Sequence, residues 1–382
     1  MNNRDLAVYV HWPYCARICP YCDFNVRRDR GQAEQADLAD AILADLAAQR
    51  ALTGERRLTS IYLGGGTPSL MRPDCAQAVI DRAVSLWTAA DDLEITLEAN
   101  PTDAEAARFA AFAAMGVGRL SLGVQSLDDA ALRFLGRNHD AAQARGAIDA
   151  GLAAFPRVSF DLIYALPGQT ADGWARELAL AASLGAEHIS PYQLTYESGT
   201  ALTRAAARGA VIPADNDLSA DLFEATQAVL TAAGFDAYEV SNHARGAAAR
   251  SRHNLAYWSG ADYAGVGPGA HGRLTLPRGR IATQAERGIG DYIGAVAREG
   301  VGYGEPEHLD GLAAAQERLL MGLRTDMGVP LADLSPLGLH AGAARLAPLL
   351  AQGLVQVVND RLMATMSGRL VLDRLTAALE SD

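Results

Sequence analysis

Three cysteines near the start of the chain, Cys15, Cys19 and Cys22, form a Cys-x3-Cys-x2-Cys run directly after the first apolar segment. Thiolates this close in sequence can all reach one metal centre, but a closed iron–sulfur or structural zinc site takes four ligands. No fourth cysteine follows nearby. A four-iron cluster held by three thiolates keeps one iron open for a small chelating ligand. The spacing favours S-adenosylmethionine, bound through its amino and carboxylate groups, and electron transfer into its sulfonium would release a radical.

The same cysteines have two alternative interpretations, a degraded zinc ribbon and three unrelated thiols. Zinc sites usually pair two Cys-x2-Cys halves across a longer gap. The remaining cysteine, Cys75, stands alone far downstream in a segment of helical period, where a thiol usually behaves as a small buried hydrophobe. The spacing therefore predicts a [4Fe–4S] cluster held by Cys15, Cys19 and Cys22.

Other residues with useful chemistry follow short apolar runs. The glycine-rich stretch Gly64–Pro68 can bring its backbone close to a ligand. Glu98 and Asp161 offer carboxylates suited to an ammonium group or a ribose diol, Gln125 is a neutral hydrogen-bonding group, and Arg137 offers a fork for a carboxylate. Each of them alone is equally consistent with a turn, a helix cap or a surface ion pair.

The elements that must position these residues are strands alternating with Ala- and Leu-rich helices. Sequential strand–helix units predict an α/β fold with a parallel sheet, either open and doubly wound or a partial barrel. The candidate residues then share the rim formed by the carboxyl ends of the strands, where ligands bind in such folds. The predicted strands are Leu6–His11, Ser60–Leu63, Leu93–Ala99, Arg119–Gln125, Val158–Leu166 and His188–Tyr196, and the helices between them are Leu38–Arg50, Pro73–Trp87, Ala104–Met115, Ala141–Ala154 and Ala171–Leu184.

The pattern changes after about residue 311, where helices and a short hairpin predict a small α+β domain of winged-helix type. Its presumptive recognition helix carries few exposed basic residues, so we expect an internal packing role rather than DNA binding. We divide the chain into a barrel (1–240), a connecting region (241–310) and this C-terminal domain (311–382). The predicted elements of the domain are helices Leu312–Arg324, Ala341–Ala351 and Gly368–Leu379, and strands Leu354–Val358 and Leu362–Ala364.

Composition sets looser bounds. The chain has 382 residues, 49% of them apolar, which is enough to bury one large domain and a smaller one. A formal net charge of −12 without any basic run argues against a nucleic-acid surface. The polar start, Met1–Leu6, is unlike a signal peptide, and no stretch reaches about 18 uninterrupted apolar residues. We therefore expect a cytoplasmic protein with no transmembrane segment, whose clustered cysteines are ligands rather than disulfide partners.

Taken in order, the motifs closely resemble the radical S-adenosylmethionine (radical SAM) superfamily, in the branch that contains oxygen-independent coproporphyrinogen III oxidase. The resemblance covers nearly the whole chain. It implies a partial (β/α)6 barrel of TIM type with a [4Fe–4S] cluster and S-adenosylmethionine at its carboxyl rim. The matching motifs are Val8–Tyr14 with the cysteine run, Leu63–Pro68, Glu98–Pro101, Ser121–Ser126 and Asp161–Gly168.

The resemblance also implies a set of S-adenosylmethionine contacts. Two of them are aromatic, three belong to the glycine-rich stretch, and four are polar or charged side chains near strand ends. They are Tyr9, Tyr21, Gly65, Gly66, Thr67, Glu98, Gln125, Arg137 and Asp161.

Two departures from the oxidase pattern narrow the function. Phe24 stands where those oxidases have a further cysteine. Only Met1–Asp5 precede the first strand, whereas the oxidases carry an N-terminal extension that helps to hold the porphyrinogen. Because a substrate with four carboxylates needs several cationic anchors, we expect no decarboxylation of coproporphyrinogen III.

The HNxxYW run at His253–Trp258 is similar to the signature of the HemW haem chaperones, a family on the same scaffold that also lacks the fourth cysteine and the extension. Imidazole is a common axial ligand of haem iron, and neighbouring aromatic rings can cover the macrocycle, so His253 is the candidate haem ligand. The alternatives are a packing role for His253 and ligation by His243 or His271.

The resemblance thus implies a chaperone that carries the cluster, S-adenosylmethionine and haem, and that delivers haem to acceptor haemoproteins, with membrane-associated acceptors among the candidates. The alternative function is a radical enzyme that decarboxylates, methylates or opens the ring of a tetrapyrrole. A DNA-binding regulator that uses the C-terminal domain is a remote third hypothesis.

Overall fold

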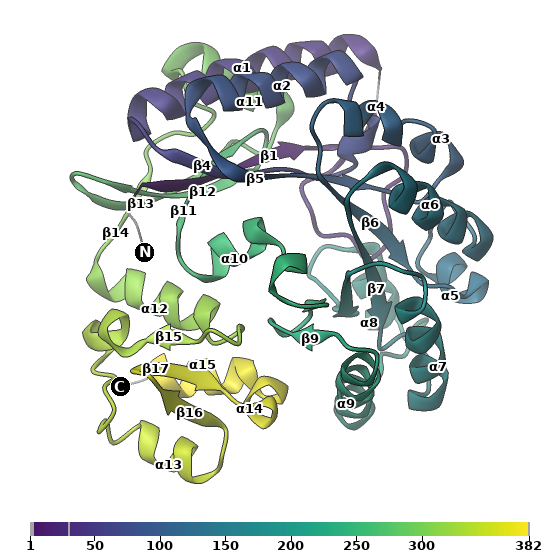
Figure 1. Ribbon diagram of the computed structural model, residues 1–382, viewed down its shortest axis with the longest axis vertical. Helices are drawn as coiled ribbons and strands as arrows, with labels where there is room; N and C mark the ends of the chain where they lie inside the picture. The colour runs from purple at the N-terminus through teal and green to yellow at the C-terminus, as the bar shows by residue number, and fades with distance from the viewer. Residues whose placement is uncertain (1–3, 30, 381–382) are drawn as a thin grey trace.

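A curved twelve-stranded sheet organises the fold (Figure 1). The computed structural model describes residues 4–29 and 31–380, so both chain ends of the predicted domain division lie outside the described residues. Six parallel strands stand side by side in sequence order and confirm the predicted strand–helix units and the partial barrel. They are β1 (Asp5–Trp12), β4 (Arg57–Gly65), β5 (Thr88–Ala99), β6 (Arg119–Gln125), β7 (Arg157–Tyr164) and β8 (His188–Gln193).

Shorter strands extend the sheet at both edges. The region 241–310, predicted as a connection, supplies most of them, because β11 joins β1 in parallel and a hairpin then continues the sheet antiparallel. At the other edge, β8 pairs with β10, which pairs with β9. These strands are β11 (Asp262–Val266), β12 (His271–Leu276), β13 (Gly279–Gln284), β14 (Glu307–Leu309), β10 (His243–Ala244) and β9 (Asp236–Ala237).

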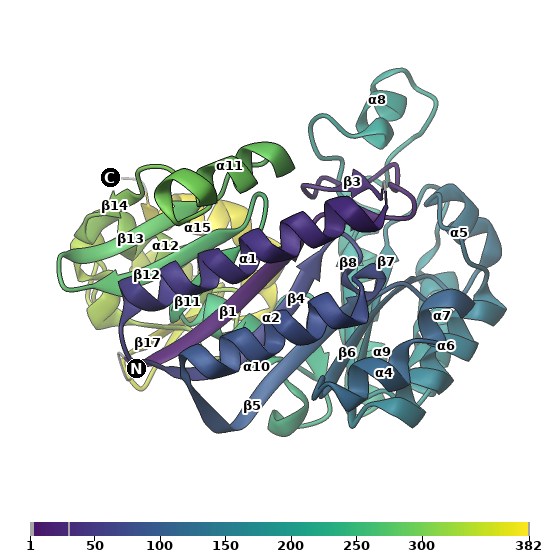
Figure 2. The ribbon, with the colours of Figure 1, turned by 90° about the horizontal axis from the view of Figure 1, so that it is seen from above.

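Helices cover the convex face of the sheet (Figures 1 and 2). The predicted helix Ala104–Met115 is wrong as a single element, because the chain breaks it into two pieces where Glu105 and Arg108 turn to hydrogen-bond with the loop at the rim. The helices of this part are α1 (Gln32–Thr53), α2 (Pro73–Leu86), α3 (Asp103–Ala106), α4 (Phe109–Ala114), α5 (Asp129–Phe134), α6 (Ala141–Ala154), α7 (Ala171–Ala182), α8 (Ala201–Ala207), α9 (Asn216–Ala232) and α11 (Ile289–Glu299).

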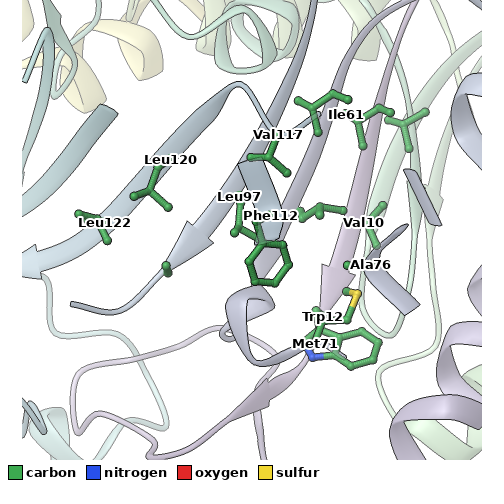
Figure 3. Packing of buried hydrophobic residues seen from close by; sticks show 14 of the residues in the cluster. Val10, Trp12, Ile61, Met71, Ala76, Leu97, Phe112, Val117, Leu120 and Leu122 are labelled. Carbon is green, nitrogen blue, oxygen red and sulfur yellow. The ribbon is translucent and has the colours of Figure 1, made fainter. Parts of the chain in front are cut away.

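The core lies between the convex face and these helices, and Figure 3 shows part of it. Trp12 from β1, Leu97 from β5 and Phe112 from α4 are each fully buried there. Met71, just after the 3-10 turn η1 (Pro68–Leu70), and Ala76 of α2 pack in the same cluster. Burial of side chains from three consecutive units fixes the strands relative to one another, and so sets where their carboxyl ends meet.

The concave side holds a short helix, α10 (Arg252–Trp258), which follows the 3-10 turn η2 (Ala247–Ala249). The backbone N–H groups of Arg252 and His253, at its N-terminus, donate to Glu94 Oε1 over 2.9 and 3.2 Å. The other oxygen of Glu94 accepts from Arg119 Nε at 2.9 Å and Arg157 Nη1 at 3.0 Å. One buried carboxylate therefore caps α10 and neutralises two arginines from neighbouring strands.

The C-terminal domain has its own three-stranded sheet and its own hydrophobic cluster. It is tied to the larger domain by ion pairs such as Arg250–Asp326 at 2.6 Å. The predicted last helix is divided at Val371, and the helix predicted from Ala341 begins only at Leu346. The elements are α12 (Gly311–Gly322), β15 (Val329–Pro330), the 3-10 helix η3 (Leu331–Leu337), α13 (Leu346–Ala351), β16 (Val355–Val358), β17 (Arg361–Ala364), α14 (Met366–Leu370) and α15 (Leu372–Glu380). Within the described ranges, no helix has the length and apolarity needed to cross a membrane.

Replacing Glu94 by Gln should destabilise the fold by about 3–5 kcal/mol, because Arg119 would keep a buried charge without its counter-ion. Urea unfolding followed by circular dichroism measures this loss. Asp5→Asn is the matched control, since Asp5 pairs with Arg57 at the surface, where solvent screens the pair and its loss costs little. Equal costs for the two variants would contradict a stabilising role for the buried network.

Candidate functional site

The cysteine run lies in the segment 13–26, which leaves the carboxyl end of β1. A small parallel pair, β2 (Tyr14–Cys15) with β3 (Arg27–Arg28), holds the two ends of this segment together. The three thiols are free and line one cavity at the carboxyl rim, which we call the rim cup. Besides the cysteines, its lining includes Tyr21, Phe24, Gly65, Gly66, Thr67, Glu98, Asn100, Ser121, Gly123, Gln125, Arg137 and Asp161.

The glycines at the end of β4 let this strand approach the cysteine segment closely. Gly65 has φ +107°, and a Cβ atom there would lie 2.7 Å from the ring of His11. A Cβ atom on Gly66 would lie 2.8 Å from the backbone of Pro13 and Tyr14. In the space so left, Gly66 N–H donates to Trp12 O at 2.8 Å. The two glycines therefore let β4 pack against the start of the cysteine segment, and their backbone lines the cup.

The side chains of Glu98, at the end of β5, and Asp161, in β7, both line the rim cup. Glu98 accepts from the Tyr62 hydroxyl at 2.7 Å and from Gly65 N–H at 3.0 Å. Burial raises the pKa of Glu98 against these hydrogen bonds. Burial and the charge of Glu98 together raise the pKa of Asp161 to about 7. A ligand in the cup that carries a positive charge or hydroxyl groups would stabilise the ionised form of both carboxyl groups.

Arg137 spans the cup. Its Nη1 donates to Cys19 Sγ at 3.3 Å, and its Nη2 donates to Asn100 Oδ1 at 2.6 Å and to Gly123 O at 2.8 Å. Its buried Nε has no hydrogen-bond partner within the described part of the chain. This guanidinium places a fixed positive charge against the thiol side of the cup, where thiolates and a ligand carboxylate would be stabilised.

Left-handed backbone also marks the rim. Gln125 at the end of β6 has φ +68°, and Ala165, just after β7, has φ +61°. Such values cost about 1–3 kcal/mol for residues other than glycine and occur preferentially at functional sites. At Gln125 this conformation turns the chain at the point where the side chain lines the cup.

Burial raises the pKa of the Cys22 thiol to about 11, against a backbone hydrogen bond and with help from the neighbouring thiols. Without metal this thiol is therefore protonated at neutral pH, and metal binding must displace its proton. No set of three His, Cys, Asp or Glu side chains in residues 4–29 and 31–380 is gathered as ligands of a single metal ion. A four-iron cluster does not require a site where three ligands meet at one metal ion, because each of its cysteines binds a different iron.

The structure brings together most of the predicted S-adenosylmethionine contacts. Eight of the nine line the cup, and the exception is Tyr9, which lines an adjoining cavity with Gly65 and Glu98. Sequence reasoning did not single out Asn100, Ser121 and Gly123 as site residues. All three lie within recognised motifs, so the motif itself was the available signal.

The predicted haem ligand, His253, and its two alternatives, His243 and His271, lie in different surroundings. The His253 ring is 2% exposed in the barrel interior, where Ser60 Oγ bonds to its Nδ1 at 2.9 Å and Tyr62 stacks on it at 4.7 Å between ring centres. Burial lowers the pKa of His253 to about 3, so the ring is neutral. His243 is 1% exposed, whereas His271 is exposed beside the rim cup.

The amino-acid sequence is similar to those of several known proteins. Residues 9–181 match the radical SAM superfamily, and residues 309–371 match the HemN C-terminal domain. The chain is 39% identical to the mitochondrial radical S-adenosyl methionine domain-containing protein 1 of Bos taurus, over 100% of this chain and 88% of that protein. It is 35% identical to the heme chaperone HemW of Mycobacterium tuberculosis (strain ATCC 25618 / H37Rv), over 99% and 96%. Identity to the heme chaperone HemW of Escherichia coli (strain K12) is 40%, over 72% of each chain.

Among solved structures, coproporphyrinogen III oxidase (HemN) from Escherichia coli, a radical SAM enzyme, superposes with a TM-score of 0.80. The match covers 99% of this chain and 90% of that one at 22% identity. It shows the same fold for both domains.

Asp161→Asn should stabilise the chain, when purified without cofactors, at about pH 8. The folded pKa of about 7 lies above the unfolded value of about 4, so between them the folded state holds a proton that the unfolded state has lost. Stability therefore falls as the pH rises through this window, and an amide removes that part of the fall. Urea unfolding at about pH 5 and about pH 8 measures the difference.

Asp149→Asn on the exposed side of α6 is the matched control for Asp161→Asn. If Asp161→Asn differs from wild type by the same free energy of unfolding at both pH values, the pKa of Asp161 does not change on folding.

Proposed function

We propose a haem-chaperone function for this chain, which belongs to the radical SAM superfamily and, within it, to the HemW family. In this function the protein binds haem and passes it to acceptor haemoproteins, membrane-associated acceptors included. The observation that carries the proposal is the identity of 35–40% to proteins named heme chaperone HemW, reaching 99% of this chain and 96% of the Mycobacterium tuberculosis protein. The shared fold with the oxidase does not separate the two functions, whereas Phe24, in place of a cysteine, favours the chaperone.

We further propose that the rim cup holds a [4Fe–4S] cluster and S-adenosylmethionine. The donor set fits, because three free thiols share the cup with two carboxyl groups of raised pKa and with a guanidinium whose Nε lacks a partner among the described residues. When bound, the pair supplies one-electron chemistry. Cys15, Cys19 and Cys22 would hold the cluster, and Glu98 and Asp161 would accept hydrogen bonds from the amino and ribose groups. Arg137 would stabilise negative charge on Cys19 and on a ligand carboxylate.

The proposed cluster gives a direct prediction. Each of Cys15→Ser, Cys19→Ser and Cys22→Ser should abolish the oxygen-labile iron–sulfur absorption after anaerobic reconstitution, because each thiolate would hold its own iron. Cys75→Ser should retain it, since Cys75 packs in α2 within the hydrophobic core. Iron and sulfide analysis with visible spectra checks the outcome, and adding S-adenosylmethionine should shift the wild-type spectrum. Stoichiometric zinc without sulfide would overturn the cluster proposal.

Haem ligation by His253 stays a prediction, and it would require a movement of α10. Tyr9, Tyr62 and Tyr257 all have rings within 6.2 Å of the His253 ring, centre to centre. A macrocycle could reach His253 Nε2 only if α10 moved away from the concave face. That movement would break the hydrogen bonds to Glu94 that hold the N-terminus of α10.

The function itself is tested by transfer. The reconstituted protein loaded with haem should pass it to an apo-haemoprotein, which a gain of the acceptor's Soret absorption reports, with one membrane-bound and one soluble acceptor tried in parallel. The same preparation should leave coproporphyrinogen III unchanged under reducing, anaerobic conditions, and Phe24→Cys should not create that activity. Protoporphyrinogen IX formed above trace turnover would support the enzyme and overturn the chaperone.

A further inference from the structure

The fold restricts which imidazole a haem iron can reach. Of the eight histidines in the chain, five are at most 6% exposed, His243 and His253 among them. Their rings hydrogen-bond inside the protein, and His11 uses both nitrogens, with Tyr9 and with Asn25 O. The exposed histidines are His271, His308 and His340.

His271 lies in a cavity directly beside the rim cup. It is the first residue of β12 and pairs with Gln284 of β13, so its backbone is held in the sheet. The cavity has a volume of about 340 Å³, and its lining includes Phe24 and Arg287. Phe24 is 60% exposed, and it lines the rim cup as well. The residues described show no hydrogen bond to the His271 ring, so both of its nitrogens are available.

Asn25 ties the two sides of this cavity together. Its Nδ2 donates to Pro268 O and to Arg287 O, each at 2.9 Å, while its own carbonyl bonds to His11 Nε2 at 2.9 Å. Gly269 has φ +80° and leaves room for Asn25, because a Cβ atom there would lie 2.7 Å from Asn25 Nδ2. The cysteine segment is thus fixed to the base of the β12–β13 hairpin, and Phe24, next to Asn25, is kept on the same side as His271.

We propose that haem docks in this cavity with His271 as an axial ligand, Phe24 against the macrocycle and Arg287 paired with a propionate. The assignment rests on the proposed haem-chaperone function and deepens it, since it names the site and the ligand. It replaces the buried His253 by an imidazole that iron reaches without displacement of α10.

The chemistry of the cavity suits each part of haem. Burial and the charges of Arg273 and Arg287 lower the pKa of His271, so the ring is neutral and offers a lone pair to iron at neutral pH. The exposed ring of Phe24 would bury apolar surface if it packed against the flat macrocycle of haem. Asp23 and Glu98 also line the cavity, but Glu98 is already bonded to Tyr62 and Gly65. The volume is at the low end of small-molecule sites, about 300–1,000 Å³, so part of the macrocycle stays outside, where an acceptor can take it.

The other exposed histidines have less suitable surroundings. His308 lines a larger groove between α11 and the β12–β13 hairpin. That groove shares no lining residue with the rim cup, so haem there would lie away from the proposed cofactor site. His340 accepts a hydrogen bond from Gly342 N–H through its Nδ1. They serve as matched controls, because both are exposed imidazoles in the same chain.

The test is an anaerobic hemin titration of the full-length, cluster-reconstituted protein, read by the Soret band. His271→Ala should weaken hemin binding at least about tenfold and remove the spectrum of histidine-ligated haem, while His308→Ala and His340→Ala stay at wild-type values. Added imidazole should restore that spectrum in His271→Ala, because the apolar and cationic contacts remain. Phe24→Ala should weaken binding and keep the ligand spectrum. Circular dichroism and iron content confirm that each variant is folded and holds its cluster.

The outcomes separate the site from the function. Hemin binding and transfer by the wild type, with His271→Ala unchanged in affinity and spectrum, would overturn the site and leave the chaperone function standing. Loss of the histidine-ligated spectrum in folded His253→Ala but not in His271→Ala would assign the ligand to His253 instead. A wild-type protein that neither binds nor transfers haem would refute the function, and the site with it.

Discussion

The close approach of β4 to the segment after β1 is the constraint on which the rest of the site depends. Gly65 and Gly66 have no side chains, so Gly66 N–H can reach Trp12 O and the cysteine segment can lie across the rim. Any side chain at these positions would collide with His11, Pro13 or Tyr14. The cysteines, the carboxyl groups and the cavity that holds His271 all take their places relative to this contact, because the same segment carries Cys15, Cys19, Cys22 and Phe24.

Buried charge is handled in opposite ways at the two ends of the sheet. At the end away from the rim, Glu94 is matched by Arg119 and Arg157 and caps α10, so its charge is satisfied within the protein. At the rim, Asp161 faces Glu98 instead, and the pKa of Asp161 is raised to about 7. Two carboxyl groups close together destabilise the folded state above the ordinary pKa of a carboxyl group. Left-handed backbone at Gln125 and Ala165 adds a conformational cost at the same rim, and such costs are typical of ligand sites.

The histidines of this chain lie in two kinds of surroundings. His253, held by Ser60 and stacked on Tyr62, fills the concave side and extends the packing of α10 to the interior of the sheet. His271 is exposed at the first position of β12, where a ring can meet a ligand from solvent. Because Phe24 lines both the cup and the cavity of His271, a ligand in either one bears on a side chain that shapes the other. The proposed cofactor and cargo sites thus share a wall.

The amino-acid sequence by itself determined the six strand–helix units, the grouping of Cys15, Cys19 and Cys22, and eight further residues of the cup, because each depends on local periodicity or on motifs at strand ends. It did not determine that 241–310 extends the same sheet, since short strands such as β11 are defined by their partner β1 and not by their own residues. It also could not rank His243, His253 and His271, because exposure depends on what the rest of the chain packs around each ring. Burial and long-range pairing exist only in the folded chain, and for that reason the tertiary structure alone decided them.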